Sequence, residues 1–434
     1  MAASTARPRR KQIAMTSPGP TCYTDEWKRS NPDYVVYLPT QAIGPDTDNS
    51  CLLVTGTSGA SLLAVWTQGT YEGADNTSVV CARSDDGGVR WTQPTEIDGP
   101  TDGRFRIALA GVPVVAQTGR VYCYYRKCAD KSDWRRFRTG DVRCRTSDDG
   151  GCTWRAASTI PMAGRTRSPQ DHVVTPPGWE PWCKPVRDAR GRWLQPFSRW
   201  LGPGSRSSDN AAMEMMRFEN LDEGPDPGDL KITWLPVEPV RPATGFDIRG
   251  LFEPCIVLLP DGRLFMVMRT LSGFITYSVS DDDGTHWRPV EPLRYHDNGD
   301  RVRHPGSPAP LFALCDGRFL LQYHNNDGSM GDGIGSGEAK WTRPNTLNRR
   351  SMFLSVGEFR PNAHQPIAFS APKKLADSDG TPAGVQHRTE MGTYSSLTDL
   401  QGRRIIWYPD RKHFLLGKNV TDAWLSDMKV PGVA

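Results

Sequence analysis

The chain has 434 residues, of which 37% are hydrophobic, and its formal net charge is only +4. No block of five or six basic residues occurs, so the sequence lacks the basic patch typical of nucleic-acid-binding proteins. No stretch approaches the ~20 apolar residues of a membrane-spanning helix, and no membrane partner is expected. The 42 Gly, 36 Pro and 14 Trp favour many turns and short strands, which fits one all-β domain of this length.

The chain's beginning and its cysteines carry little functional information. The basic segment from Arg7 to Lys11 has no apolar stretch behind it and is not a secretory signal, so we expect residues 1–29 to form a disordered tail. The protein is then either cytoplasmic or begins after a removed leader. The ten cysteines include no CxxC pair and no Cys/His spacing typical of zinc, so we expect buried thiols, no metal and no cofactor. Nothing in the sequence indicates an oligomeric state.

One short motif occurs three times in the chain. The copies are Ser84-Asp-Asp-Gly-Gly-Val-Arg-Trp91, Ser147-Asp-Asp-Gly-Gly-Cys-Thr-Trp154 and Ser280-Asp-Asp-Asp-Gly-Thr-His-Trp287. Each has the form Ser-x-Asp-x-Gly-x-x-Trp. As a hairpin turn, the motif lets the Asp side chain accept from backbone N–H groups, gives Gly the positive φ and plugs Trp into the neighbouring layer.

A second repeat predicts the number of structural units. A Gly-led turn followed by a strand-like apolar run occurs six times, at Gly59, Gly119, Gly191, Gly262, Gly317 and Gly402. Six such turns indicate six blades of antiparallel strands arranged radially, in which the Asp motif closes the outer pair of strands. We therefore predict an all-β, six-bladed β-propeller over residues 30–434. The run Tyr34-Val-Val-Tyr-Leu is expected to close the ring against the last blade.

The repeated Asp motif resembles the Asp-box, or BNR repeat, of the sialidase superfamily. With six blades, the chain resembles a member of that superfamily from about residue 30 to residue 418. The resemblance implies a glycan or glycoside substrate and a retaining glycosidase whose nucleophile is a Tyr activated by a neighbouring Glu. Because non-enzymatic and lyase propellers also carry the motif, the motif alone is weak evidence for function.

Three segments match the family's catalytic pattern. Gly392-Thr-Tyr394-Ser-Ser-Leu-Thr-Asp-Leu resembles the nucleophile segment, which implies that Tyr394 is the nucleophile. Phe252-Glu253-Pro-Cys-Ile-Val-Leu-Leu-Pro-Asp-Gly-Arg-Leu resembles the segment of the partner Glu and ends on the strand that leads to Arg269, a substrate-binding Arg in the family. Arg349 and Arg350 precede the fifth-blade strand where the family places another substrate Arg, and the sequence leaves open which of the two faces inward.

The acid/base residue and one arginine depart from the pattern. The family's acid is an Asp in the loop before the first Asp-box, where this chain offers Glu72 and Asp75. The family's first Arg has no counterpart in the stretch Pro45-Asp-Thr-Asp-Asn-Ser-Cys-Leu-Leu-Val. In the family this Arg would bind the substrate carboxylate, and an Arg–carboxylate pair is a strong charge-assisted contact. Because this Arg is missing, a different sugar, acidic or neutral, is at least as consistent with the sequence as sialic acid.

Two alternatives come from the same residues. His304 and His324 follow or interrupt predicted strands. Together with Tyr394 they would suit proton abstraction next to a uronate, as in a polysaccharide lyase. A purely structural role is the commoner interpretation of both. A non-catalytic glycan-binding propeller is the third hypothesis. Our first interpretation is the glycosidase, with Tyr394, Glu253 and either Glu72 or Asp75 as catalytic residues. The candidate substrate-binding residues are Arg269, Arg349, Arg350, His304 and His324.

Overall fold

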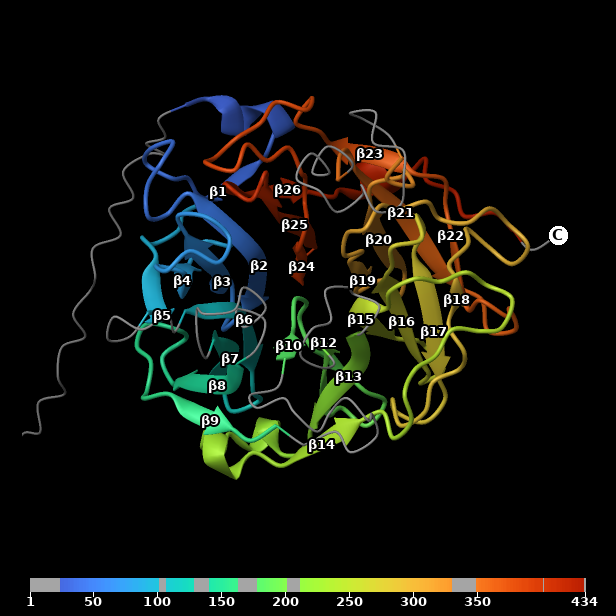
Figure 1. Ribbon diagram of the computed structural model, residues 1–434, viewed down its shortest axis with the longest axis horizontal. Helices are drawn as coiled ribbons and strands as arrows, with labels where there is room; N and C mark the ends of the chain where they lie inside the picture. The colour runs from blue at the N-terminus through green and yellow to red at the C-terminus, as the bar shows by residue number, and fades with distance from the viewer. Residues whose placement is uncertain are drawn as a thin grey trace, which may run out of the picture.

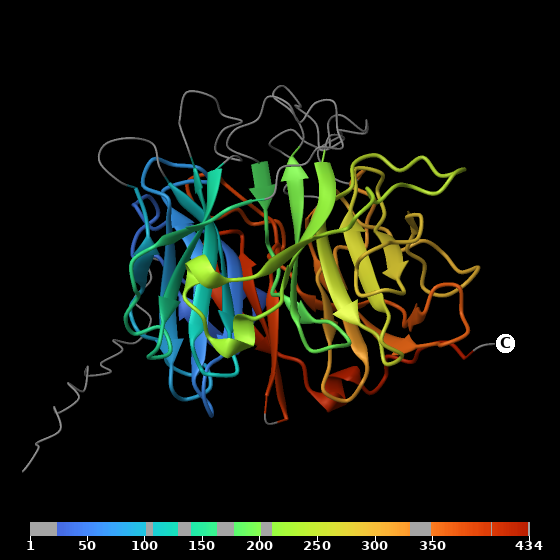
Figure 2. The ribbon, with the colours of Figure 1, turned by 90° about the horizontal axis from the view of Figure 1, so that it is seen from below.

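The computed structural model describes residues 24–100, 107–128, 140–162, 178–200, 211–329, 349–400 and 402–432. These residues form six antiparallel sheets around a central axis (Figure 1), which confirms the predicted six-bladed β-propeller. Seen edge-on, the strands run from one face of the disc to the other (Figure 2). Helical elements of the described residues are η1 (Glu26–Ser30), η5 (Leu221–Glu223), η6 (Pro227–Asp229) and α1 (Asp422–Leu425). None of the helices in these ranges has the length and apolar character required to cross a membrane.

Each blade has its innermost strand at the axis and its later strands farther out (Figure 1). Blade one contains β2 (Asp48–Gly56), β3 (Leu62–Gly69), β4 (Ser78–Ser84) and β5 (Thr95–Asp98); blade two contains β6 (Ala108–Val115), β7 (Val121–Cys128), β8 (Gly140–Ser147) and β9 (Ser158–Ile160); blade three contains β10 (Gly178–Glu180), β11 (Val186–Arg187), β12 (Trp193–Trp200), β13 (Ala211–Phe218) and β14 (Ile232–Leu235).

The second half of the ring repeats this order. Blade four contains β15 (Phe252–Leu258), β16 (Leu264–Arg269), β17 (Thr276–Ser280) and β18 (Glu291–Pro292); blade five contains β19 (Leu311–Ala313), β20 (Phe319–Tyr323), β21 (Met352–Phe359), β22 (Ile367–Phe369) and β23 (Lys373–Ala376); blade six contains β24 (Ser396–Leu400), β25 (Arg403–Asp410), β26 (Phe414–Asn419) and β1 (Tyr34–Tyr37).

The six Gly-led turns connect the axial strand or strands of each blade to the next strand. All six glycines have positive φ, at Gly59, Gly119, Gly191, Gly262, Gly317 and Gly402. Glycine has no Cβ, so it adopts this left-handed conformation without steric cost, which explains the repeated residue. The prediction of one such turn per blade is confirmed.

The three Ser-x-Asp-x-Gly-x-x-Trp turns share one set of hydrogen bonds. In the first copy, the Ser84 hydroxyl accepts from the backbone N–H of Gly88 at 2.8 Å and donates to Asp86 at 2.9 Å, and Asp86 accepts from the N–H of Arg90 at 2.9 Å. The other two copies repeat these contacts. Trp91 packs edge-on against Trp407 of blade six, with ring centroids 5.5 Å apart. The predicted turn chemistry and the predicted contact with a neighbouring layer are therefore both present.

The ring is closed by the N-terminal strand. β1 pairs with β26, the third strand of blade six, so strands from the two ends of the chain share one sheet, as predicted. η1 reinforces this closure, since the buried Ser30 hydroxyl donates to Asp410 at 3.0 Å. Residues 26–29, which the sequence assigned to a disordered tail, form part of η1; residues 1–23 of that predicted tail lie outside the described residues.

We expect the contact between Gly88 and Trp407 to control the stability of the junction between blades one and six. A Cβ at Gly88 would lie 2.4 Å from the Trp407 ring, whereas a Cβ at Gly119 would meet nothing within 4 Å. Both glycines have positive φ. Gly119→Ala should lower the free energy of unfolding by about 1–2 kcal/mol from backbone conformation alone, and Gly88→Ala by about 1–3 kcal/mol more from overpacking. Denaturant titration measures both; equal losses would contradict the role of the Trp407 contact.

Candidate active site

The residues predicted as nucleophile, base and substrate Arg meet near the axis. The Tyr394 hydroxyl donates to Glu253 Oε1 at 2.9 Å, and Arg269 Nη1 donates to Glu253 Oε2 at 2.7 Å. All three side chains are buried. Tyr394 precedes β24 of blade six, whereas Glu253 and Arg269 lie on β15 and β16 of blade four. The fold thus brings together residues that are 141 positions apart in the sequence.

A repeated backbone feature positions these side chains. The axial strands β2, β6 and β15 each have a register irregularity near their first residues, and Cys51, Ala110 and Glu253 have positive φ there. Tyr394 has a φ of 65° at the corresponding end of β24. A bulge inserts one extra residue and re-aims the side chain beside it, often next to a functional site. Glu253 and Tyr394 therefore share a backbone device that is repeated in blades one and two.

The surroundings of Tyr394 keep its hydroxyl protonated. Burial raises the pKa of Tyr394 well above its ordinary value, and the charge of Glu253 raises it further, whereas Arg269 opposes this shift. The Trp182 ring packs edge-on at a centroid distance of 6.0 Å, and the Lys412 ammonium lies 5.3 Å from the centre of the Tyr394 ring. A phenol in this setting becomes a nucleophile only when a base takes its proton, and the Glu253 carboxylate already accepts that hydrogen bond.

A group of paired charges lies beside Tyr394, and we call it the charge cluster: Asp48, Glu72, Arg349, Arg388, Glu390 and Lys412. Lys412 Nζ lies 3.0 Å from Glu72 and 3.9 Å from Glu390. Arg388 contacts Glu72 at 2.5 Å and Glu390 at 2.9 Å. Each cation of the cluster therefore faces at least one carboxylate, as buried charges require.

Asp48 is the carboxyl group of the cluster with the weakest ion pairing. It begins β2, its side chain is only 7% exposed, and its nearest cation is Arg388 at 3.9 Å. Burial raises the pKa of Asp48 to about 7, against the charges of Arg388 and Lys412. A carboxyl group with this pKa carries a proton in about half of the molecules at neutral pH, so Asp48 can donate one.

Of the two predicted acids, Glu72 lies in the charge cluster and Asp75 does not. Lys412 holds the pKa of Glu72 well below its usual range, with Arg388 acting in the same direction. Although its side chain is 43% exposed, Glu72 is ionised in this arrangement and holds no proton to donate. Asp75 lies on the exposed part of the same loop between β3 and β4.

The structure separates the two neighbouring arginines. Arg349 donates to Glu390 at 3.0 Å and to the Gly306 carbonyl at 2.8 Å, which places it in the charge cluster. Arg350 instead pairs with Asp377 at 3.1 Å. Of these two predicted substrate ligands, Arg349 is therefore the one on the side of Tyr394.

His304 and His324 form a buried stacked pair with ring centroids 5.3 Å apart. His304 contacts the Ser307 carbonyl at 2.8 Å and accepts from the backbone N–H of His324 at 3.2 Å, whereas His324 contacts the Ser307 hydroxyl and the Ser351 carbonyl. Burial lowers the pKa of His304 well below its ordinary value and that of His324 to about 4, so both rings are neutral near pH 7. All four ring nitrogens of this pair have a hydrogen-bond partner, which is consistent with a structural role for both histidines.

Sequence reasoning missed Asp48, Arg388, Glu390 and Lys412. Asp410, Arg411, Lys412 and His413, which lie at the connection between β25 and β26, are all at most 3% exposed. A run of charged residues between two apolar strands is normally read as a solvated turn, so the sequence alone gives no signal of burial. Across the described ranges, no three His, Cys, Asp or Glu side chains are placed to hold a metal ion.

Comparison with known proteins identifies the family. The model of the BNR repeat-like domain matches residues 60–402. No curated protein matches the chain.

Solved structures match across most of the fold. A protein of unknown function from Dyadobacter fermentans has a TM-score of 0.58 at 14% identity, over 90% of this chain and 97% of that one. The intramolecular trans-sialidase of Ruminococcus gnavus has a TM-score of 0.58 at 15% identity, over 93% and 99% of the two chains. The leech intramolecular trans-sialidase has a TM-score of 0.59 at 14% identity, over 91% and 71%. At identities this low, the structural matches establish the shared fold. Because the family model matches most of its length, this chain belongs to the BNR repeat-like family.

Proposed function

We propose that the protein is a retaining exo-glycosidase that removes a terminal sugar from a glycan with Tyr394 as nucleophile. The observation that carries the proposal is the buried hydrogen-bonded group of Tyr394, Glu253 and Arg269. A tyrosine of blade six and a carboxylate of blade four have little structural reason to be buried together, since burial of either polar group is costly unless it finds a partner. As a nucleophile and its base, they are already within the required hydrogen-bond distance.

The first step of this mechanism follows from that group. Tyr394 Oη attacks the anomeric carbon of the sugar while Glu253 accepts the phenolic proton. The bond from the anomeric carbon to the leaving oxygen breaks, and an acid donates a proton to that oxygen. Water then attacks the anomeric carbon and gives a proton to the acid, which now acts as base; the bond from that carbon to Tyr394 Oη breaks, and Glu253 returns its proton to the phenolate, so that the configuration is retained. Arg269 stabilises the Glu253 carboxylate before the proton moves.

We assign the acid to Asp48. It is a buried carboxyl group with a pKa of about 7, in the charge cluster that lies against Tyr394 through Lys412. A general acid works best when its pKa lies near the working pH. Glu72, kept ionised by Lys412 and Arg388, is better suited to holding those two cations in place. Asp75 is the second candidate, and the dependence of rate on the leaving group distinguishes it from Asp48.

The charges of the site favour a sugar that has no carboxylate where the family's arginines would bind one. Asp48 and Cys51 occupy the start of β2, in the stretch that lacks the family's first Arg. Arg269, Arg349 and Arg388 are each paired with a carboxylate of the protein. A carboxylate on the sugar would compete for these cations and would approach Glu253 and Glu390. We therefore propose a neutral, hydroxyl-rich terminal sugar.

Replacing Tyr394 or Glu253 should abolish hydrolysis without unfolding the protein. We expect Tyr394→Phe to reduce turnover of the best aryl glycoside below detection, because the nucleophilic oxygen is removed. Glu253→Gln should reduce kcat about 10²–10⁴-fold through loss of the base. The assay is release of the aryl alcohol from a panel of neutral, deoxy, uronic and sialic glycosides. Tyr34→Phe, in the ring-closing strand, is the matched control and should retain activity.

This panel also separates the competing functions. Activity that survives Tyr394→Phe would contradict the nucleophile. An unsaturated, ultraviolet-absorbing product from a uronic-acid glycan would favour the lyase. Sugar binding without turnover in the wild type and in Tyr394→Phe would favour a glycan-binding propeller.

The acid can be identified from the dependence of rate on the leaving group. We expect Asp48→Asn to slow hydrolysis of poor leaving groups about 10²–10⁴-fold but to leave a dinitrophenyl glycoside nearly unaffected, because a good leaving group needs no proton. Wild-type kcat/KM for poor leaving groups should fall as pH rises through about 7, where Asp48 loses its proton. Glu72→Gln and Asp75→Asn are the comparison variants. If Asp75→Asn alone shows this pattern, the acid is Asp75.

A further inference from the structure

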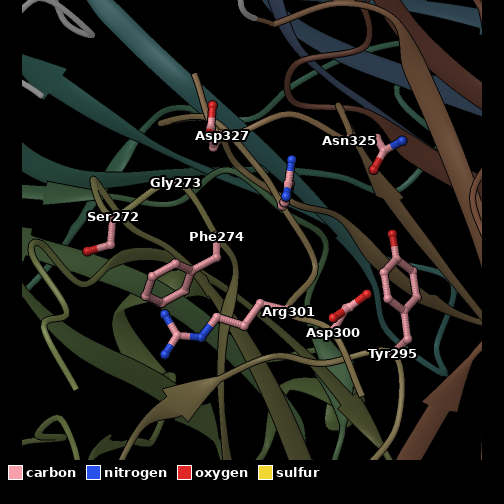
Figure 3. A pocket seen from close by; sticks show the side chains of 9 residues that line it. Ser272, Gly273, Phe274, Tyr295, Asp300, Arg301, Asn325 and Asp327 are labelled. Atoms are coloured by element: carbon pink, nitrogen blue, oxygen red, sulfur yellow. The ribbon is translucent and has the colours of Figure 1, made fainter. Parts of the chain in front are cut away.

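A cavity outside the candidate active site lies at the junction of blades four and five. Its volume is about 600 Å³, and we call it the rim pocket (Figure 3). The residues that line it are Ser272, Gly273, Phe274, Tyr295, Asp300, Arg301, Arg303, Asn325 and Asp327. Ser272 lies three positions after Arg269, and Asn325 directly follows His324. The rim pocket therefore opens on the end of the propeller that carries Arg269, outward from the candidate active site.

A hairpin presents two arginines to the rim pocket. Backbone bonds from Tyr295 to Asp300 and from Val302 to Leu293 form the hairpin, and a bridge between Arg303 and Phe274 attaches it to blade four. Val302 is fully buried, whereas Arg301 and Arg303 are exposed. This alternation places both guanidinium groups on the same side of an extended segment.

The orientation of Arg301 is set by two aromatic rings. Its guanidinium lies 4.9 Å from the centre of the Phe274 ring and 5.9 Å from that of Phe246, and Figure 3 shows it beside Phe274. In the part of the chain that the structure describes, neither Arg301 nor Arg303 forms an ion pair with a carboxylate. By contrast, Arg269 and Arg349 of the candidate active site are each paired with a carboxylate. A stacked planar guanidinium with free donors is pre-organised to bind an oxyanion through two hydrogen bonds.

The rest of the lining suits a sugar rather than a bare anion. Asp300 adds a carboxylate and Asn325 an amide, whereas the Asp327 carboxylate already accepts from the backbone N–H of Ser329 at 2.9 Å; Tyr295 shares a hydrogen bond of 3.0 Å with Tyr323. A small inorganic anion would lie close to these two carboxylates without donating a hydrogen bond to either. An acidic sugar offers an oxyanion to the arginines and hydroxyl donors to the carboxylates at the same time.

We propose that the rim pocket binds an acidic sugar unit of an oligosaccharide, one that bears a carboxylate or a sulfate group, with Arg301 and Arg303 holding the oxyanion. This binding does not depend on the proposed hydrolysis. The rim pocket is separate from the position where the terminal sugar would be cleaved, so a glycan with a neutral end and an acidic unit farther along the chain fits both.

The test measures binding by calorimetry with four ligands: a sulfated oligosaccharide, a uronic-acid oligosaccharide, a neutral oligosaccharide of the same length, and inorganic sulfate. We expect at least one acidic oligosaccharide to bind, more tightly than the neutral one and inorganic sulfate, and to weaken as salt is raised. Arg301→Gln and Arg303→Gln should each raise Kd at least tenfold, and Arg301→Lys should give an intermediate value because it keeps the charge but loses the planar fork.

Two variants serve as controls. Arg288→Gln removes another exposed arginine of blade four, one that follows the Asp turn at the opposite end of the blade and pairs with Asp281, and it should leave Kd unchanged. Tyr394→Phe should also leave Kd unchanged, which separates the rim pocket from the proposed catalytic function. The proposal is overturned if no acidic oligosaccharide binds, if Arg301→Gln binds as tightly as the wild type, or if the neutral oligosaccharide or inorganic sulfate binds as tightly as the acidic ones.

Discussion

The buried carboxylate of Glu253 determines much of the architecture around the axis. A charge removed from water is tolerated only when it is paired and hydrogen-bonded, and Glu253 meets this requirement with Arg269 on one oxygen and Tyr394 on the other. Because these partners come from blades four and six, the ring must close with the correct register for the carboxylate to be satisfied. The same contact that a catalytic mechanism would use therefore also links blades four and six across the axial end of blade five.

The charge cluster extends this constraint to blade one. Lys412 of blade six lies between Glu72 and Glu390 and above the Tyr394 ring, so that its ammonium is shared by three groups. The start of β2 contributes the carboxyl group of Asp48 to this cluster. Because Glu72 of blade one pairs with Lys412 of blade six, the cluster also links these two blades beside Tyr394.

Much of the fold could be predicted because its signals are local. A positive φ at Gly317 or a hydrogen bond from Ser84 to Asp86 depends on residues within a few positions, and the repeats multiplied each signal. Tyr394, Glu253 and Arg269 could be proposed as one group because the family's local motifs include them. Lys412 could not, since its partner Glu72 lies 340 positions away and only ring closure brings the two together. The choice between Arg349 and Arg350 likewise depends on Glu390 and Asp377, whose positions no local pattern reveals.

The rim pocket and the candidate active site treat cations in opposite ways. Near Tyr394 the arginines and Lys412 are neutralised by carboxylates, which preserves the geometry and leaves little net attraction for an anion. In the rim pocket, Arg301 is held by aromatic rings instead, so its orientation is fixed while its charge and donors stay available. Stacking fixes a guanidinium without consuming its hydrogen bonds, and ion pairing fixes it by consuming them. The two proposals together describe a propeller that would hold a glycan by an acidic unit while acting on a neutral one.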